Sequence, residues 1–175
     1  MTSQEWWALI HGMGLGAVYL LAFAGGLAGL YSFRPEWLTE SGIAERARRL
    51  DWGVWVMAIA AWLTCITGTW IVYPWYRAAP PEGTTELADY PRYFLLDNAN
   101  LAAWHTFGME WKEHVAWFAP LLATAVAYVV WRYRSELAER KQLRDALIVM
   151  FVLAFAAAAV AGLFGALITK AAPVA

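Results

Sequence analysis

The sequence predicts an all-α protein, an integral-membrane four-helix bundle that occupies residues 1–175 as a single transmembrane domain. Two observations predict this fold. Of the 175 residues, 61% are hydrophobic and only 15% are charged. Lys, Arg, Asp and Glu are absent from four stretches, namely residues 6–33, 52–76, 115–131 and 146–169. A helix needs roughly 20 apolar residues to cross a hydrocarbon core of about 30 Å. The first, second and fourth stretches reach this length by themselves. The third, residues 115–131, reaches it when residues 110–114 at its border are included.

Residues 3–33 form the first predicted helix. Thr2 and Glu5 have the spacing of a capping box, in which each side chain satisfies a backbone N–H at a helix start. A cleavable signal peptide begins with a basic region and a short apolar stretch. This segment has neither feature, so we expect it to remain as a membrane helix.

The second predicted helix covers residues 42–76. Four apolar residues recur at helical spacing before and into its charge-free stretch, which places its start near Ser41; they are Ile43, Ala47, Leu50 and Val54. Prolines and a glycine rule out a continuous helix from about Pro74 to Pro91. Residues 74–97 are therefore expected to form a loop.

Residues 98–138 and 140–169 form the third and fourth predicted helices. Asp97 is a candidate cap for a helix that begins at Asn98. The link between these helices lacks Gly and Pro, and Glu136 precedes Arg140 by about one helical turn. This pattern predicts a tight hairpin whose helices extend beyond the membrane.

The distribution of Lys and Arg predicts the orientation, because both are concentrated in loops that face the cytoplasm. Residues 34–49 contain four Arg, and residues 132–144 contain four Arg and one Lys. Residues 74–97 contain only two Arg and four acidic residues. We therefore expect a multi-pass protein of the bacterial inner (plasma) membrane, with both termini and residues 74–97 on the periplasmic, outer side.

Charge and cysteine content exclude several function classes. The net charge of −1 argues against a nucleic-acid partner. Cys65 is the only cysteine, which excludes an internal disulfide and the Cys-x-x-Cys-His motif of c-type haem.

The three histidines, His11, His105 and His114, lie near the same end of the predicted helices. Ionisable residues at the border of a membrane helix usually line a pathway or hold a cofactor. Counting about 20 residues back from the cytoplasmic ends places His11 and His114 at similar depths. Two neutral imidazoles that face each other across a bundle suit the axial positions of a b-type haem. We therefore predict one haem b with His11 and His114 as iron ligands.

Further candidates surround these ligands. The glycines next to His11 leave room for a flat macrocycle or, equally, for close helix packing; they are Gly12, Gly14 and Gly16. Arg77 and Lys112, at the outer ends of their helices, are candidate partners for haem propionates or an anionic headgroup. Snorkelling to the interface explains both residues equally well.

His105 precedes His114 by nine residues, so the two histidines project from opposite faces about 13 Å apart and cannot bind one metal. We expect His105 to be an ordinary interfacial residue, with a second site or a proton relay as alternatives. Glu110 and His114 share a helix face, so a metal or proton site built from Glu110, His114 and His11 is a competing hypothesis.

An aromatic belt marks the outer membrane boundary, as is common for membrane proteins. A quinone-head pocket lined by these residues is the less favoured interpretation; they are Tyr73, Trp75, Tyr76, Trp104, Trp111 and Trp117.

Four helices, histidines at matched depth and a glycine-rich first helix resemble the small four-helix membrane cytochromes b of respiratory chains. These include the cytochrome b561-like proteins and the membrane anchors of quinone-linked dehydrogenases. The resemblance covers the bundle and includes no diagnostic motif. It implies electron transfer through haem b, with quinone as a second candidate cofactor. Two-haem members need four histidine ligands and this chain has three, so at most one bis-histidine haem fits.

The leading hypothesis is an electron-transfer subunit of a respiratory or other redox complex. Its partners would be the lipid bilayer, other membrane subunits and an outer-side redox protein. One alternative is a cofactor-free accessory subunit of a larger membrane complex. Another is a small metal- or proton-dependent membrane enzyme or transporter that uses Glu110 and His114.

Overall fold

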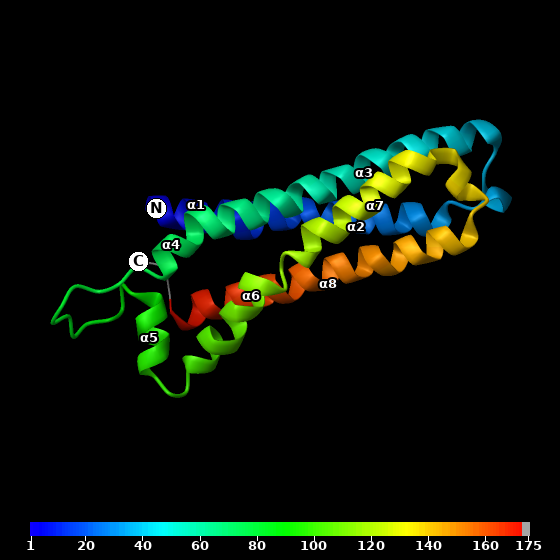
Figure 1. Ribbon diagram of the computed structural model, residues 1–175. Coiled ribbons are helices and arrows are strands. Elements are labelled where there is room, and N and C mark those ends of the chain that lie inside the picture. Colours follow the sequence, from blue (N-terminus) through cyan, green and yellow to red (C-terminus); the bar gives the residue numbers. More distant parts are fainter. Residues whose placement is uncertain (173–175) are drawn as a thin grey trace.

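The computed structural model describes residues 1–172; residues 173–175, with the C-terminus predicted to face outward, lie outside the described part. Within residues 1–172 the regular structure is entirely helical. In this part of the chain, four helices are long and apolar enough to cross a membrane, and they pack as one elongated bundle (Figure 1). They span Ser3–Ser32, Glu40–Tyr76, Trp104–Ala138 and Lys141–Ala171. The predicted bundle of four long apolar helices is confirmed.

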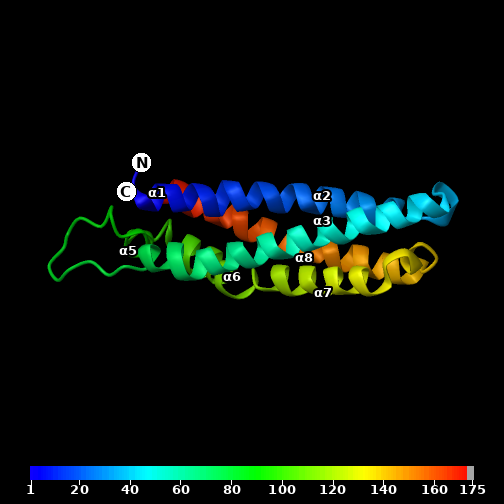
Figure 2. The same ribbon diagram turned by 90° about the horizontal axis from the view of Figure 1, so that it is seen from above.

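The bundle has two distinct ends, which both views show (Figures 1 and 2). We call one the terminal end, because it holds the N-terminus, the last turns of α8 (Lys141–Ala171) and the short helix α5 (Pro91–Asp97). The other is the basic end, formed by the links at residues 33–39 and 134–140.

The first spanning helix consists of α1 (Ser3–Ala8), a π-helical segment (Leu9–Gly14) and α2 (Leu15–Ser32). Its predicted capping box is confirmed. The Thr2 N–H donates to Glu5 Oε2 at 2.7 Å, and the Glu5 N–H donates to Thr2 Oγ1 at 3.2 Å. The helix start is therefore held by its own side chains.

The second spanning helix consists of α3 (Glu40–Thr67), a π-helical segment (Gly68–Val72) and α4 (Tyr73–Tyr76). Thr39 caps its start, because its Oγ1 accepts from the Gly42 N–H at 3.2 Å. The predicted apolar stripe is largely buried; Ala47 is 5%, Leu50 4% and Val54 0% exposed.

The third spanning helix is broken. A π-helical segment (Trp104–Met109) leads into α6 (Glu110–His114), a turn occupies residues 115–117, and α7 (Phe118–Tyr133) follows. A 3-10 turn (Arg134–Ala138) closes the hairpin to α8. The predicted Glu136–Arg140 pair is present at 2.8 Å.

The segment before this helix differs from the prediction. Asp97 does not cap a helix at Asn98; it is the last residue of α5 (Pro91–Asp97). Pro91 begins α5, because the first position of a helix does not use its N–H. Asn98 Oδ1 instead accepts from the Asn100 N–H at 3.0 Å and forms a turn.

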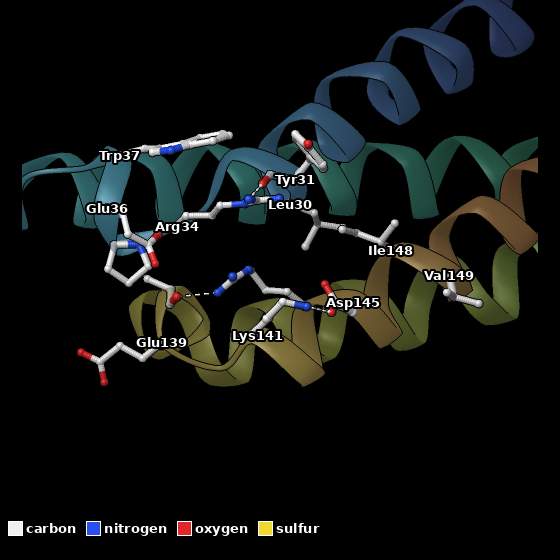
Figure 3. Close-up of a pocket in the computed structure, with 13 residues that line it drawn as sticks. Leu30, Tyr31, Arg34, Glu36, Trp37, Glu139, Lys141, Asp145, Ile148 and Val149 are labelled. Atoms are coloured by element: carbon white, nitrogen blue, oxygen red, sulfur yellow. Dashed lines mark hydrogen bonds and ion pairs between the residues drawn. The ribbon is translucent and has the colours of Figure 1, made fainter.

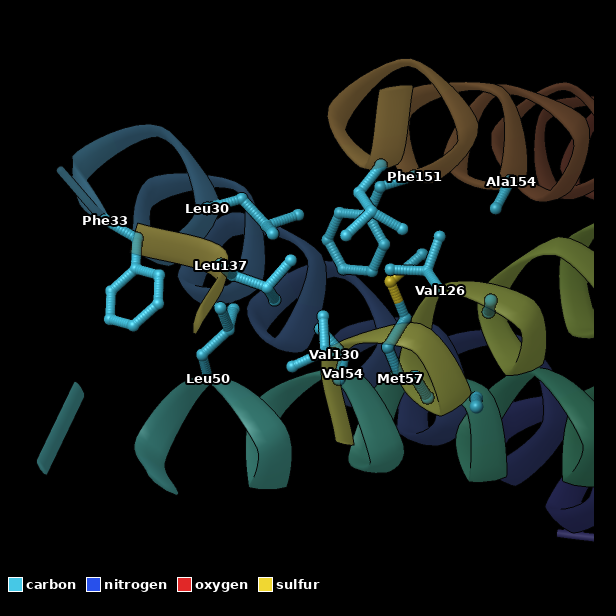
Figure 4. Close-up of a cluster of buried hydrophobic side chains, with 14 of the residues drawn as sticks. Leu30, Phe33, Leu50, Val54, Met57, Val126, Val130, Leu137, Phe151 and Ala154 are labelled. Atoms are coloured by element: carbon cyan, nitrogen blue, oxygen red, sulfur yellow. The ribbon is translucent and has the colours of Figure 1, made fainter. Parts of the chain in front are cut away.

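The main core joins α2, α3, α7 and α8 (Figure 4), and it extends to Leu137 and Ala138 at the basic end. Gly26 of α2 lets Phe151 of α8 approach, and the Phe151 ring lies 5.4 Å from that of Phe23. The Tyr19 hydroxyl donates to the Ala154 carbonyl at 2.8 Å. A smaller cluster at the terminal end packs α5 against the spanning helices; its buried members are Tyr76, Leu95, Met109, Ile168 and Ala172.

Candidate functional site

His11 lies in the first π-helical segment and points toward the second spanning helix. Its Nδ1 is 2.9 Å from Thr67 Oγ1, and the Thr67 hydroxyl donates to the Leu63 carbonyl at 2.7 Å. A hydroxyl has one proton, so Thr67 accepts from the Nδ1–H of His11. In the neutral imidazole Nε2 then carries the lone pair, which is the state of a metal-binding histidine.

A glycine on the neighbouring helix makes room for this ring. A Cβ at Gly68 would lie 2.8 Å from His11 Cε1, so a larger residue there would displace the His11 ring. Sequence reasoning missed Gly68, because only the position of the His11 ring on another helix shows why it must be small.

The predicted glycines behave differently. A Cβ at Gly12 or Gly16 would meet no atom within 4 Å, and one at Gly14 would meet only the Leu9 carbonyl of its own helix, at 3.9 Å. Close packing between helices of this chain therefore does not explain these glycines. Clearance for a macrocycle remains a prediction.

His114 points out of the bundle. It ends α6, and its side chain is 70% exposed. Its Nδ1 lies 2.9 Å from the Glu110 carbonyl and 3.4 Å from Glu110 Oε2. Because the carbonyl can only accept, Nδ1 carries the proton and the Nε2 lone pair of the neutral ring faces away from the helix backbone.

The two predicted ligands therefore do not face each other: His11 turns inward and His114 turns outward. A bis-histidine haem needs two ligand nitrogens on opposite sides of one macrocycle. The arrangement inside one chain does not fit a haem held between His11 and His114. Each imidazole is nevertheless held in the tautomer that leaves Nε2 free, so a ligand role for either ring remains a prediction.

Lys112 and Arg77 take different positions. Lys112 is half-buried and reaches α8, where a Cβ at Gly165 would lie 3.0 Å from its Nζ. Arg77 is exposed, with its Cζ 5.3 Å from the centre of the Tyr73 ring.

His105 is buried, since only 9% of it is exposed. Its Nδ1 is 2.8 Å from the Tyr76 hydroxyl, which joins the second and third spanning helices. The helix α5, which holds Arg92, contacts the π-helical segment of His105, and Glu113 follows in α6. Within residues 1–172, Arg92 Nε and Glu113 Oε1 are buried without a hydrogen-bond partner. The sequence carries no signal for this cluster, because α5 was not predicted.

The alternative metal site lacks a third ligand. Glu110 and His114 lie together as their spacing predicts, but His11 is turned away from them. Across the described chain, no group of three or more His, Cys, Asp or Glu side chains is placed to hold a metal ion.

Comparisons with protein-family models, with curated protein sequences and with solved structures find no match to this chain. Its function is therefore inferred from its own residues.

Proposed function

We propose that the chain is an electron-transfer subunit of a redox complex in the bacterial inner membrane. In this proposal haem b lies on the lipid-facing surface of the bundle, between His114 and a ligand supplied by a neighbouring membrane chain. The terminal end faces the periplasm, as the distribution of Lys and Arg predicts. The outward direction of the His114 imidazole is the observation that carries the proposal.

The hydrogen bond of His114 supports a ligand role. Metal-binding histidines usually donate their second ring N–H to a carbonyl or carboxylate, which fixes the ring and its tautomer. The Glu110 carbonyl accepts this bond at 2.9 Å, with the Glu110 carboxylate near by. The Nε2 atom is left without a partner among residues 1–172, on a side chain that is mostly exposed.

The exposed position of His114 on the outside of the bundle indicates that a neighbouring chain covers it. Ionisable residues at membrane depth almost always face a bundle interior or a water-filled cavity, because facing lipid is costly. The side chains of His114 and Glu110 are 70% and 51% exposed on the outside of their own bundle. A second membrane chain packed on α6 would remove this cost for both groups.

The surroundings of His114 suit a macrocycle. Phe107 and Phe118, seven residues before it and four after it in the sequence, are 59% and 56% exposed, so aromatic surface near this part of the chain is left uncovered. Arg77 is exposed and stays the candidate cation for a propionate, whereas Lys112 reaches toward α8.

A bound haem iron would supply one-electron chemistry. The chain itself would orient the His114 ring through the Glu110 carbonyl and present apolar surface around it. Electron transfer between a quinone and an outer-side redox protein would then involve the neighbouring subunit, because the proposed site lies at the surface that this subunit covers.

The visible spectrum of the protein purified in mild detergent tests this function. We expect a b-type α-band in the dithionite-reduced minus oxidised difference spectrum. Pyridine-haem quantification would give about half a haem per chain if two copies each donate His114, and about one if a different subunit donates the second ligand. A featureless spectrum from a folded protein with its partner retained would refute the haem proposal.

Matched histidine variants locate the ligand. His114→Ala should abolish haem binding, whereas His11→Ala and His105→Ala should retain it, because these two rings contact Thr67 and Tyr76 inside the bundle. A haem held within one chain would require His11 and would be lost in His11→Ala. Full haem content in His114→Ala would exclude the ligand role proposed for it.

A cofactor-free accessory subunit is the second candidate function. It is favoured by the same exposed pair, because Glu110 and His114 can hydrogen-bond directly to a neighbouring membrane helix. In that case no visible absorption is expected, and His114→Ala should reduce recovery of the partner subunit in co-purification. The two candidate functions therefore differ in whether the wild-type protein has a visible absorption band that His114→Ala removes.

A further inference from the structure

A pocket of about 590 Å³ opens at the basic end, between the link that follows α2 and the first turns of α8 (Figure 3). One wall is apolar and includes Leu30, Ile148 and Val149. Val149 is 58% exposed, so this wall continues onto the lipid-facing surface of α8. The pocket thus has a polar part at the helix ends and an apolar part that leads into the membrane.

Arg144 brings a buried positive charge to this pocket. It is only 7% exposed, and its Nη1 donates to the Leu137 carbonyl at 2.7 Å and to the Ala138 carbonyl. In the described part of the chain no carboxylate forms an ion pair with Arg144. The neighbouring Asp145 is paired with Lys141 at 2.5 Å. A buried guanidinium without an acidic partner is costly unless an anion accompanies it.

Arg34 brings a second guanidinium group, held in place by aromatic rings. Its Cζ lies 4.7 Å from the centre of the Tyr31 ring and 4.8 Å from that of Trp37, and its Nε donates to the Tyr31 carbonyl at 3.1 Å. Within residues 1–172, Arg34 forms no ion pair either. Three acids line the pocket: Asp145, which pairs with Lys141, and Glu36 and Glu139, which are exposed. Figure 3 shows Glu139 directed away from Arg34.

We propose that this pocket binds the phosphate group of an anionic phospholipid between Arg34 and Arg144. The planar guanidinium group matches phosphate geometry with two parallel hydrogen bonds. Basic pockets between membrane helices at the cytoplasmic surface bind anionic lipid headgroups. The acyl chains would lie along the wall formed by Leu30, Ile148 and Val149, which is why a lipid is favoured over a soluble phosphate compound. This site is independent of the haem proposal.

Native mass spectrometry and thermal unfolding of the whole chain in neutral detergent test the site, with phosphatidylglycerol as the probe. We expect one tightly bound phosphatidylglycerol per chain, a higher unfolding midpoint in its presence, and no such effect of phosphatidylcholine. Arg34→Gln should weaken binding by about tenfold or more, the loss that follows when a charge-assisted hydrogen bond is removed.

Arg48→Gln is the matched control, because Arg48 lies near the same end but is 70% exposed and pairs with Glu45. Equal phosphatidylglycerol binding by the wild-type protein and by both variants would overturn the proposal. Equal stabilisation by inorganic phosphate, lost in Arg34→Gln, would show that the pocket takes soluble phosphate and would overturn the lipid assignment. If Arg34→Gln does not fold, Arg34→Lys keeps the charge without the planar group; unchanged lipid binding in that variant would count against the site.

Discussion

Two adjacent glycines of α2 allow a direct test of the core packing. A Cβ at Gly26 would lie 2.7 and 2.8 Å from two atoms of the Phe151 ring, whereas a Cβ at Gly25 would meet no atom within 4 Å. Both residues lie in the same helix, so the helix propensity gained by each substitution with alanine is nearly the same. The comparison of Gly26→Ala with Gly25→Ala therefore isolates the contact with Phe151.

The size of the effect follows from the geometry. Ordinary van der Waals contact begins at about 3.4 Å, so the Phe151 ring must retreat by about 0.7 Å (3.4 minus 2.7) to admit the new methyl group. Phe151 is 0% exposed and its ring packs against Phe23, so the ring has little space into which to move. Overpacking of a well-packed core costs about 1–3 kcal/mol. We expect Gly26→Ala to be less stable than Gly25→Ala by this amount.

The free energy of unfolding in mixed detergent micelles, followed by tryptophan fluorescence, measures this difference. Gly25→Ala should be as stable as the wild-type protein, or more stable by up to about 1 kcal/mol. If the two variants agree within about 0.5 kcal/mol, the packing of Gly26 against Phe151 is refuted, because that value is typical of substitutions that touch nothing.

Two tyrosine variants extend the same measurement to buried hydrogen bonds. Tyr76→Phe removes the 2.8 Å bond to His105 Nδ1 and leaves a buried ring nitrogen unpaired, which should cost about 1–3 kcal/mol. Tyr19→Phe removes the 2.8 Å bond to the Ala154 carbonyl and should cost less, about 1 kcal/mol, because this carbonyl lies inside a continuous helix that keeps its own bonds. Wild-type stability in Tyr76→Phe would contradict the buried position of His105, and the same result in Tyr19→Phe would contradict the contact between α2 and α8.

The existence of four spanning helices could be predicted because it depends on properties averaged over many residues. A charge-free stretch of about 20 residues admits few structures other than a membrane helix. The buried stripe through Ala47, Leu50 and Val54 was predictable for the same reason, since a regular helix repeats its contacts every three or four residues.

The direction of the histidine side chains could not be predicted from this regular spacing. A π-helical turn contains one extra residue and so rotates the following side chains by about 100°. His11 and His105 both lie in π-helical segments, and the third helix breaks directly after His114. Counting residues therefore estimates depth along the helix but not the face on which each ring lies.

The glycines show a second limit of prediction from the sequence. The sequence draws attention to Gly12 and Gly16 because they are close to a histidine, whereas Gly26 and Gly68 are the positions where a side chain would collide. The need for glycine at these two positions comes from Phe151 and His11 on other helices. Such a need becomes visible only when the helices are placed together.

Residues 1–172 contain three π-helical segments, Leu9–Gly14, Gly68–Val72 and Trp104–Met109, which all lie toward the terminal end of the bundle. The larger buried cluster extends to Leu137 and Ala138 at the basic end. Leu9–Gly14 and Gly68–Val72 contain no buried residue, so their backbone amides should exchange with solvent deuterium before those of the helices in the larger cluster. The basic end is therefore the more rigid half of the bundle, and the terminal end is the more adaptable half. A subunit that docks beside α6 would bind the adaptable half, where binding can order the backbone most.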